Sequence, residues 1–181
     1  TAYVPVELYG AIGNLLRSTS SNGSGAYAFS GLPSGRYFVR SRDTGGRADA
    51  LFNGLACVGN ACQVRLGTPI DLAPPATTLF TADLTLTAAA SISGTITRAD
   101  NSNPLSGVQG QLLTPSGAVA LSTTSSGSGT FVFNGLAGGN YHLVTRGTPG
   151  FIDVAWPSAP CPSACSGLNG SSIPVVAGTA V

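Results

Sequence analysis

The sequence contains no lysine and no methionine, and it has only one histidine, one tryptophan and one glutamate. Charged residues make up 8% of the 181 residues, against about 25% in an average soluble domain. The eight basic residues are all arginines spread along the chain, and the formal net charge is +1. Because no basic stripe is available to follow a phosphate backbone, the composition excludes a nucleic-acid partner.

The same absences exclude several kinds of active site. A Walker-type phosphate loop requires a lysine, which the chain lacks. The lone histidine, His142, has no surrounding motif that would place it between a nucleophile and a carboxylate. The spacing of the carboxylates suggests no acid/base pair. We therefore expect no catalytic residue, no cofactor and no enzymatic activity.

Long apolar runs are also missing. No run approaches the roughly 18 residues that a membrane-spanning helix requires, so we expect no membrane insertion. The first residues do not have the form of a secretory signal peptide, and we interpret the chain as a mature product or an internal segment. Hydrophobic residues still make up 43% of the chain, enough apolar area to favour a folded protein over a disordered one.

The four cysteines fall as two close pairs, Cys57 with Cys62 and Cys161 with Cys165. An even number of cysteines in a chain rich in serine and glycine is typical of an oxidising compartment, so we expect an extracellular or cell-surface location. Four cysteines allow three connectivities. The matched placement of the two pairs in the repeat described next favours two local disulfides over a shared zinc site.

Two copies of one pattern run through the chain. Gly31 aligns with Gly135 and Tyr37 with Tyr141, an offset of 104 (135 − 31). The offset holds back to position 4, and beyond the cysteine pairs it becomes 103 (165 − 62). Self-similarity at a fixed period indicates copies of one folding unit. We predict two domains, residues 1–88 and 89–181.

Each copy has the period of two that is typical of β-strands. It runs through residues 4–9, where the even positions take the core face. It runs again where Tyr37 and Val39 take the core face and Phe38 and Arg40 the opposite face. No segment has a helical period. The chain is therefore expected to be all-β.

The second copy repeats the pattern, with Tyr141 and Leu143 on the core face and His142 and Val144 on the opposite face. Clusters of serine, glycine and asparagine break the strands at short intervals, which favours antiparallel β-sandwiches.

Leu32 and Leu136 each follow a glycine at the same turn. We expect both leucines to close the core end of their sandwich.

The two copies differ at their outer strands. Residues 91–97 read as the opening strand of the second copy, and residues 79–86 as the closing strand of the first. Shifted by the repeat offset, each segment falls outside the sequence. The first copy is therefore expected to lack its opening strand and the second its closing strand. Because an unpaired edge exposes backbone donors and acceptors, we expect both edges to be filled head to tail, either by flanking repeats or by other copies of the chain.

Several short motifs carry a family resemblance: residues 92–97, 104–108, 129–136 and 139–141. They resemble the carboxypeptidase regulatory-like repeat, a transthyretin-like (Ig-like) β-sandwich related in fold to the B-type, CnaB-like repeats of bacterial surface adhesins. The resemblance implies two such sandwiches in a row and a role as a stalk, spacer or adhesive module. Those adhesin relatives often carry a Lys–Asn isopeptide bond, which a chain without lysine cannot form. The cysteine pairs are then the covalent reinforcement.

The leading hypothesis is a non-enzymatic structural repeat of an extracellular filament, pilus-like fibre or adhesin stalk. The alternative is a carbohydrate-binding module, for which Trp156 and Tyr9 are weak candidates for glycan contact. Trp156 aligns with Phe52, which favours a ring covering the disulfide loop. Asn22 and Asn169 begin glycosylation triplets that read equally well as Asn-Gly turns. Asp43, Asp49 and Asp153 are the weak candidates for calcium, but no oxygen-rich loop surrounds them.

Overall fold

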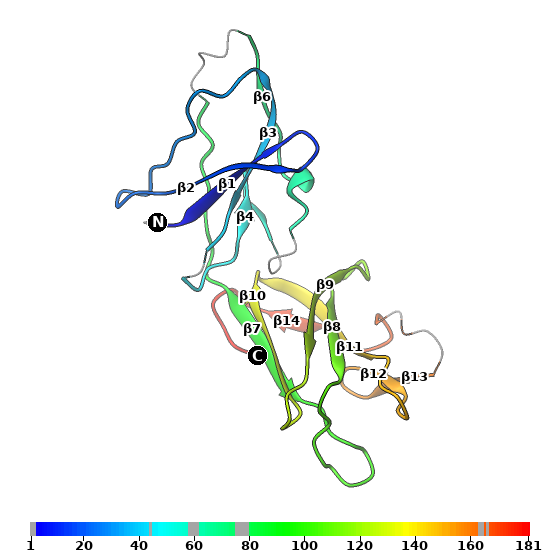
Figure 1. Cartoon of the computed structure of the whole chain (residues 1–181). Helices are drawn as coiled ribbons and strands as arrows, with labels where there is room; N and C mark the ends of the chain where they lie inside the picture. Colours follow the sequence, from blue (N-terminus) through cyan, green and yellow to red (C-terminus); the bar gives the residue numbers. More distant parts are fainter. Residues whose placement is uncertain (1–2, 44, 58–61, 75–79, 163–164, 166) are drawn as a thin grey trace. The chain divides into compact units, whose positions relative to one another are not determined.

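The regular secondary structure of the protein consists mainly of β-strands, and the chain divides into two units that are described separately below (Figure 1). The computed structural model describes residues 3–43, 45–57, 62–74, 80–162, 165 and 167–181. Unit 1 is Thr1–Ala88 and unit 2 is Ala89–Val181. The helix found in the described residues is a single 3-10 turn, η1 (Val64–Leu66). The all-β prediction is therefore confirmed. In the part of the chain that is described, no helix has the length and apolar character to span a bilayer.

Unit 1 is built on one antiparallel sheet with the strand order β2-β1-β3-β4-β5, and β6 pairs with β3. Its strands are β1 (Pro5–Gly10), β2 (Leu15–Ser20), β3 (Gly35–Ser41), β4 (Ala50–Leu51), β5 (Leu55–Ala56) and β6 (Ile70–Leu72). The register places Leu8 opposite Val39 and Tyr37 opposite Ile70. These four side chains and Val6 form the buried core of the unit.

Unit 2 has two antiparallel sheets. The larger has the order β13-β12-β11-β8-β9, with β14 paired to β11, and the smaller consists of β10 and β7. The strands are β7 (Ala90–Thr95), β8 (Gln109–Leu113), β9 (Val119–Thr124), β10 (Thr130–Leu136), β11 (Gly139–Arg146), β12 (Asp153–Ala155), β13 (Ala159–Cys161) and β14 (Ile173–Val175). Phe133 of the smaller sheet faces Gly110 of the larger one, where an added Cβ would lie 3.6 Å from the ring.

The strands of the large sheet follow the repeat offset closely. β2 and β9 begin at Leu15 and Val119, and β3 and β11 begin at Gly35 and Gly139. The small sheet differs, because residues 26–32 of unit 1, which correspond to β10, form no strand. Each unit therefore has its own large sheet with the same strand arrangement, and the two units differ in the small sheet.

Both faces of the large sheet are covered, which corrects the simple alternation expected for β3 and β11. Phe38 and Arg40 are buried, at 6% and 4% exposure, although the period of two placed them on the outer face. Val144, the counterpart of Arg40, is fully buried. The reason is a second, smaller apolar cluster on that face. In unit 1 it contains Leu51, Cys57 and Val64, with Cys62 packed against it.

The turn before β3 and β11 is fixed in the same way in both units. The hydroxyl of Tyr37 donates to the carbonyl oxygen of Pro33 at 2.9 Å, and that of Tyr141 donates to Ala137 at 2.9 Å. A glycine in the left-handed region precedes each turn, with φ of +64° at Gly31. Because only glycine adopts this conformation without strain, the Gly-Leu turn recurs at the same position in each copy.

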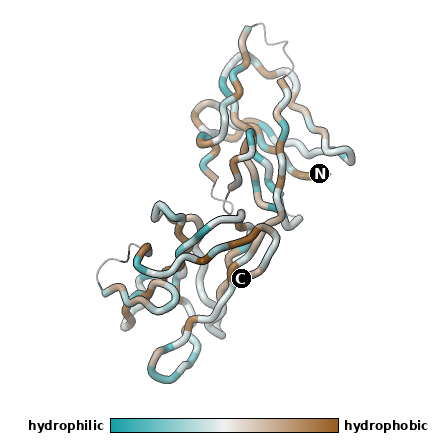
Figure 2. Tube along the Cα trace, turned by 180° about the vertical axis from the view of Figure 1, so that it is seen from behind, coloured by the Kyte–Doolittle hydropathy of each residue, from teal (hydrophilic) through white to brown (hydrophobic). Residues whose placement is uncertain are grey.

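Figure 2 shows hydrophilic colour in short, scattered stretches of the trace, in keeping with the low charge of the sequence. The buried polar groups are mostly satisfied by the backbone. Ser125 Oγ accepts the N–H of Val108 at 3.0 Å and donates to the carbonyl oxygen of Leu105 at 2.7 Å. Its counterpart Ser21 accepts the N–H of Val4 at 2.9 Å. These serines tie the chain entering the first strand to the strand that follows.

Candidate functional site

The clearest candidate site is a groove in unit 1, and unit 2 provides the reference for it. In unit 2, β7 lies against β10 so that Ile92 is opposite Phe133 and Ala90 is opposite Leu136. Ile92 is 3% exposed and Leu136 fully buried. The small sheet therefore closes the core of unit 2.

Residues 26–32 of unit 1, the counterpart of β10, have no covering strand. The apolar side chains of Tyr27, Phe29 and Leu32 still pack against the core, but they are only partly buried. Leu32 thus differs from the expectation of a fully buried plug, whereas Leu136 is 0% exposed. The physical reason is that none of the described residues of unit 1 forms a strand against residues 26–32 as β7 does against β10 in unit 2.

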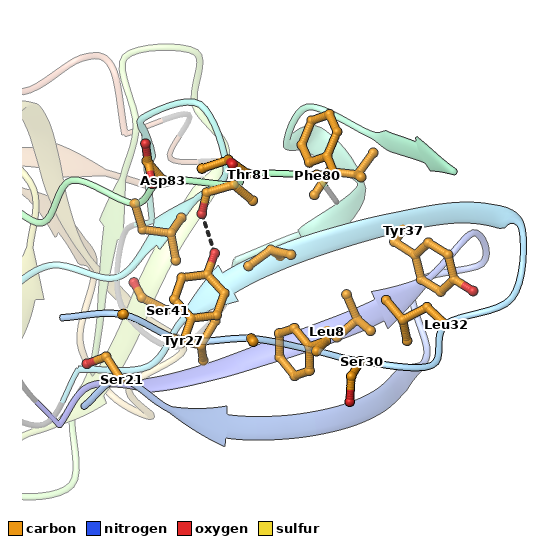
Figure 3. A pocket seen from close by; sticks show the side chains of 18 of the residues that line it. Leu8, Ser21, Tyr27, Ser30, Leu32, Tyr37, Ser41, Phe80, Thr81 and Asp83 are labelled. Atoms are coloured by element: carbon orange, nitrogen blue, oxygen red, sulfur yellow. Dashed lines mark hydrogen bonds between the residues drawn. The ribbon is translucent and has the colours of Figure 1, made fainter. Parts of the chain in front are cut away.

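The result is a cavity of about 810 Å³ lined by residues of unit 1. The wall residues include the partly buried side chains of residues 26–32, and the floor is formed by β1, β3 and β6. In Figure 3, Leu8, Leu32 and Tyr37 lie together toward one end of the cavity. Its volume falls within the roughly 300–1,000 Å³ typical of ligand pockets.

The opposite wall is formed by residues 80–86. The sequence predicted a closing strand over residues 79–86; Leu79 lies outside the described residues, and residues 80–86 are extended but belong to no strand. Ala82, Leu84 and Leu86 are partly buried and alternate with exposed residues. The segment keeps the period of a strand and lacks the backbone partner that would make it one.

Tyr27 bridges the two walls. Its hydroxyl donates a hydrogen bond to the carbonyl oxygen of Ala82, drawn as the dashed line in Figure 3. Burial, with a smaller contribution from the nearby Asp83 carboxylate, raises the pKa of Tyr27 to about 12. The phenol is therefore neutral and acts as a hydrogen-bond donor over the whole physiological range.

The predicted cysteine sites lie away from this groove, on the far face of each large sheet. Cys57 and Cys62 form one disulfide and Cys161 and Cys165 the other. Cys161 and Cys165 belong to a buried cluster with Val144. Each disulfide therefore packs into the small cluster that covers the outer face of its own unit.

A buried charged cluster was not predicted from the sequence. Arg40, 5% exposed at its side chain, lies 3.8 Å from Glu7 Oε2 and 3.7 Å from Asp49 Oδ2. Tyr9 donates its hydroxyl to the same Glu7 oxygen at 2.6 Å. Burial raises the pKa of the Asp49 carboxyl. The distances from Arg40 to the two carboxylates are long, and among the described residues two of the guanidinium nitrogens of Arg40 have no hydrogen-bond partner. The carboxylates therefore compensate the buried charge of Arg40 only in part.

The aspartates considered for calcium have structural roles. Asp49 Oδ1 accepts the N–H of Asp43 at 2.6 Å, and Asp153 Oδ2 accepts the N–H of Gly147 at 3.2 Å, the matching bond in unit 2. Among the described residues no group of three metal-ligating side chains is found. His142 Nδ1 is buried without a hydrogen-bond partner in the described structure, so no carboxylate orients it for catalysis.

The aromatic residues considered for glycan contact lie in different units, Tyr9 in unit 1 and Trp156 in unit 2. Tyr9 is partly buried against the apolar cluster beneath the disulfide. Trp156, in unit 2, is 43% exposed. Asn22 forms a turn in which its Oδ1 accepts the N–H groups of Ser24 at 3.0 Å and Ala26 at 2.9 Å. Phe52, the counterpart of Trp156, contacts Phe80 edge to face at 5.7 Å.

No family model and no curated protein matches the chain. Among solved structures it is similar to the Bacillus anthracis TIE protein, with a TM-score of 0.40 and 12% identity over 99% of this chain and 29% of that one. It is also similar to a streptococcal ancillary pilin, with a TM-score of 0.36 and 16% identity over 100% of this chain and 56% of that one. The shaft pilin SpaA from Lactobacillus rhamnosus GG gives a TM-score of 0.37 and 11% identity over 89% of this chain and 85% of that one.

The chain thus spans less than two thirds of the length of the first two proteins. Because all three TM-scores are below 0.5, the functional argument below rests on the geometry of this chain.

Sequence reasoning missed the groove residues Phe29, Ala82 and Leu84. The sequence does contain a signal for these residues, because Phe29 aligns with Phe133 and residues 82 to 86 alternate between apolar and polar side chains. The Arg40 cluster also had a signal. Glu7 and Arg40 are both charged in the first copy, whereas the second copy has an uncharged residue at each of these positions.

Proposed function

We propose that this chain is a non-enzymatic structural module of an extracellular filament or surface stalk, in which β-sandwich units follow one another in a row. The observation that carries the proposal is the recurrence of the same large antiparallel sheet in two successive units. Copies of one folding unit that follow one another along a chain are suited to linear assembly.

The chemistry of the chain supports this function. Each unit carries a local disulfide, and disulfides persist in oxidising, extracellular environments. The described residues contain neither an oriented histidine nor a cluster of metal ligands. No observation favours carbohydrate binding, since Tyr9 is engaged with Glu7.

The finer assignment to the carboxypeptidase regulatory-like repeat, with domains 1–88 and 89–181, belongs to the same proposal. It is supported by the recurrence of the Gly-Leu turn and of the tyrosine hydrogen bond that closes it. A family defined by such short motifs specifies a fold better than a function.

Negative-stain electron microscopy of the native material tests the function. Material identified by peptide mass spectrometry as containing this chain should form fibres or stalks with a regular axial repeat. Dispersed soluble particles, with the chain recovered as a free monomer from its native source, would show that the proposed function is wrong.

A further inference from the structure

Four asparagines of the chain are followed directly by glycine: Asn22, Asn53, Asn134 and Asn169. The side-chain amide of an asparagine can be attacked by the backbone nitrogen of the next residue. A glycine at that next position leaves the approach open, because it has no Cβ and rotates freely. The four sites share this local sequence, so the surrounding structure decides how readily each of them reacts.

The turn that begins at Asn22 surrounds its side-chain carbonyl with hydrogen-bond donors. Asn22 Oδ1 accepts from the hydroxyl of Ser24 at 2.7 Å, and from the backbone N–H groups of Ser24 at 3.0 Å and Ala26 at 2.9 Å. When a nucleophile attacks the amide carbon, negative charge develops on this oxygen. Donors at about 2.7–3.1 Å are the arrangement that stabilises such an oxyanion in enzymes. The turn therefore favours attack at the side chain of Asn22.

The neighbouring backbone nitrogen is available as the nucleophile. Among the described residues, the N–H of Gly23 donates to no backbone or side-chain acceptor. Asn22, Gly23 and Ser24 are all exposed. An added Cβ at Gly23 would contact the hydroxyl of Tyr3 at 3.6 Å, an ordinary van der Waals distance. Rotation of this peptide group toward the Asn22 side chain therefore meets little steric resistance.

At each of the other three sites a contact opposes the same reaction. The N–H of Gly54 is donated to the carbonyl oxygen of Leu51 at 3.1 Å. Asn134 lies within β10, where pairing with β7 holds the backbone extended. At Gly170 an added Cβ would lie 2.3 Å from the carbonyl oxygen of Trp156, so this glycine is packed against backbone. Each of these contacts must break before the nitrogen can reach the side chain.

We propose that Asn22 is a site of spontaneous covalent modification to aspartate and isoaspartate. The nitrogen of Gly23 forms a bond to Asn22 Cγ and gives up its proton. The bond from Cγ to Nδ2 breaks, and Nδ2 leaves with that proton as ammonia, so that a five-membered succinimide remains. Water then adds to one of the two ring carbonyls. Opening of the ring at Cγ gives aspartate, and opening at the backbone carbonyl gives isoaspartate, in which the main chain runs through Cγ.

The modification changes both the charge and the backbone of the turn. A carboxylate replaces a neutral amide, so the formal net charge of the chain falls from +1 to 0 (1 − 1). Isoaspartate also inserts a further carbon into the main chain between β2 and residues 26–32. The reaction consumes only water, so it requires no enzyme and no cofactor.

Unit 2 contains the same turn without the reactive amide. The N–H of Asn22 donates to the carbonyl oxygen of Ala26 at 2.8 Å, and the N–H of Ser126 donates to that of Thr130 at 2.8 Å. Ser126 Oγ takes the place of the asparagine oxygen and accepts the N–H groups of Ser128 at 3.3 Å and Thr130 at 3.2 Å. Asn22→Ser therefore keeps the turn and removes the group that reacts.

The test incubates the full 181-residue chain in mildly alkaline buffer and follows the four Asn-Gly sites by peptide mass spectrometry. Fragmentation that cleaves the main chain distinguishes isoaspartate from aspartate. In the folded chain, products should accumulate at Asn22 at least about 3-fold faster than at each other site, because each of those must first lose a contact. In urea the four rates should converge, because the local sequence is then all that they retain.

Three variants, each first shown by thermal melting to be folded, test the chemistry. Asn22→Ser should abolish the product at this position and leave the other three sites unchanged. Gly23→Ala should suppress it, because a Cβ crowds the attacking nitrogen. Ser24→Ala removes the shortest hydrogen bond to Asn22 Oδ1 and should slow the reaction at least about 3-fold. The matched control is Ser18→Ala, at an exposed serine of β2, which should leave the rate unchanged.

Products that appear at another of the four sites before Asn22, or at equal rates at all four in the folded chain, would overturn the proposal. An unchanged or faster reaction in Ser24→Ala would overturn it as well, because the donors around Asn22 Oδ1 would then not assist the attack. So would a glycan on Asn22 in native material, since Nδ2 would be bonded to the sugar and would not leave as ammonia.

Discussion

The two turn leucines provide a direct test of the difference between the closed and the open unit. Leu136 is 0% exposed, and replacing such a residue with alanine costs about 2–5 kcal/mol, because the lost transfer free energy adds to that of the cavity left behind. Leu32 is only partly buried beside an open groove. Half of the roughly 1.5–3 kcal/mol for burying a leucine side chain gives about 1 kcal/mol, and the groove adds little cavity cost.

The assay is urea denaturation followed by hydrogen-exchange mass spectrometry, which reports each unit through its own peptides. Fluorescence of Trp156, the sole tryptophan, follows unit 2 independently. Leu66→Ala, at an exposed site of unit 1, serves as the control and should change stability by less than about 0.5 kcal/mol.

Equal losses for Leu32→Ala and Leu136→Ala, or a larger loss for Leu32→Ala, would refute the reasoning, because unit 1 would then be as closed as unit 2.

Four further perturbations test other parts of the structure. The fold raises the pKa of Tyr27 from 10 to about 12, so the neutral Tyr27 phenol stabilises the folded state fully below pH 10, and this stabilisation is lost as the pH rises through 12. Thermal melts should therefore show a fall in stability at alkaline pH, and Tyr27→Phe should reduce that fall. Arg40→Leu leaves the buried Asp49 carboxylate uncompensated and should cost about 3–5 kcal/mol in urea; a loss below about 1 kcal/mol would contradict the ion cluster. Ser125→Ala leaves a buried N–H unpaired and should cost about 1–3 kcal/mol, whereas the exposed Ser116→Ala should be neutral. Reducing the disulfides should cost about 2 kcal/mol per unit, and cooperative melting of both units should persist.

Strand positions were accessible from the sequence because local chemistry determines them. The Gly-Leu turn requires a left-handed glycine, with φ of +64° at Gly31 and +73° at Gly135, and the alternation that follows marks the next strand. That the first copy lacks its opening strand was inferred from the offset between the copies and stays a prediction.

The far face of the large sheet could not be predicted in the same way. Phe38 and Arg40 lie at positions that a period of two assigns to solvent, yet both are buried, and Arg40 lies near the carboxylates of Glu7 and Asp49. Strand periodicity does not encode contacts of this kind. The groove itself needed the spatial relation of residues 26–32 to residues 80–86, which are far apart in the sequence.

The parallel contact between β7 and residues 179–181 has a mechanical consequence. Where a pulling force enters through β7 and leaves through residues 179–181, the two segments slide past each other, and their hydrogen bonds are loaded together. An antiparallel hairpin pulled at its open end gives way one bond at a time. The two disulfides join cysteines only 5 and 4 residues apart in the sequence. Each therefore shortens the fully extended chain by only a few residues. Resistance to tension in unit 2 is therefore concentrated in the small parallel contact.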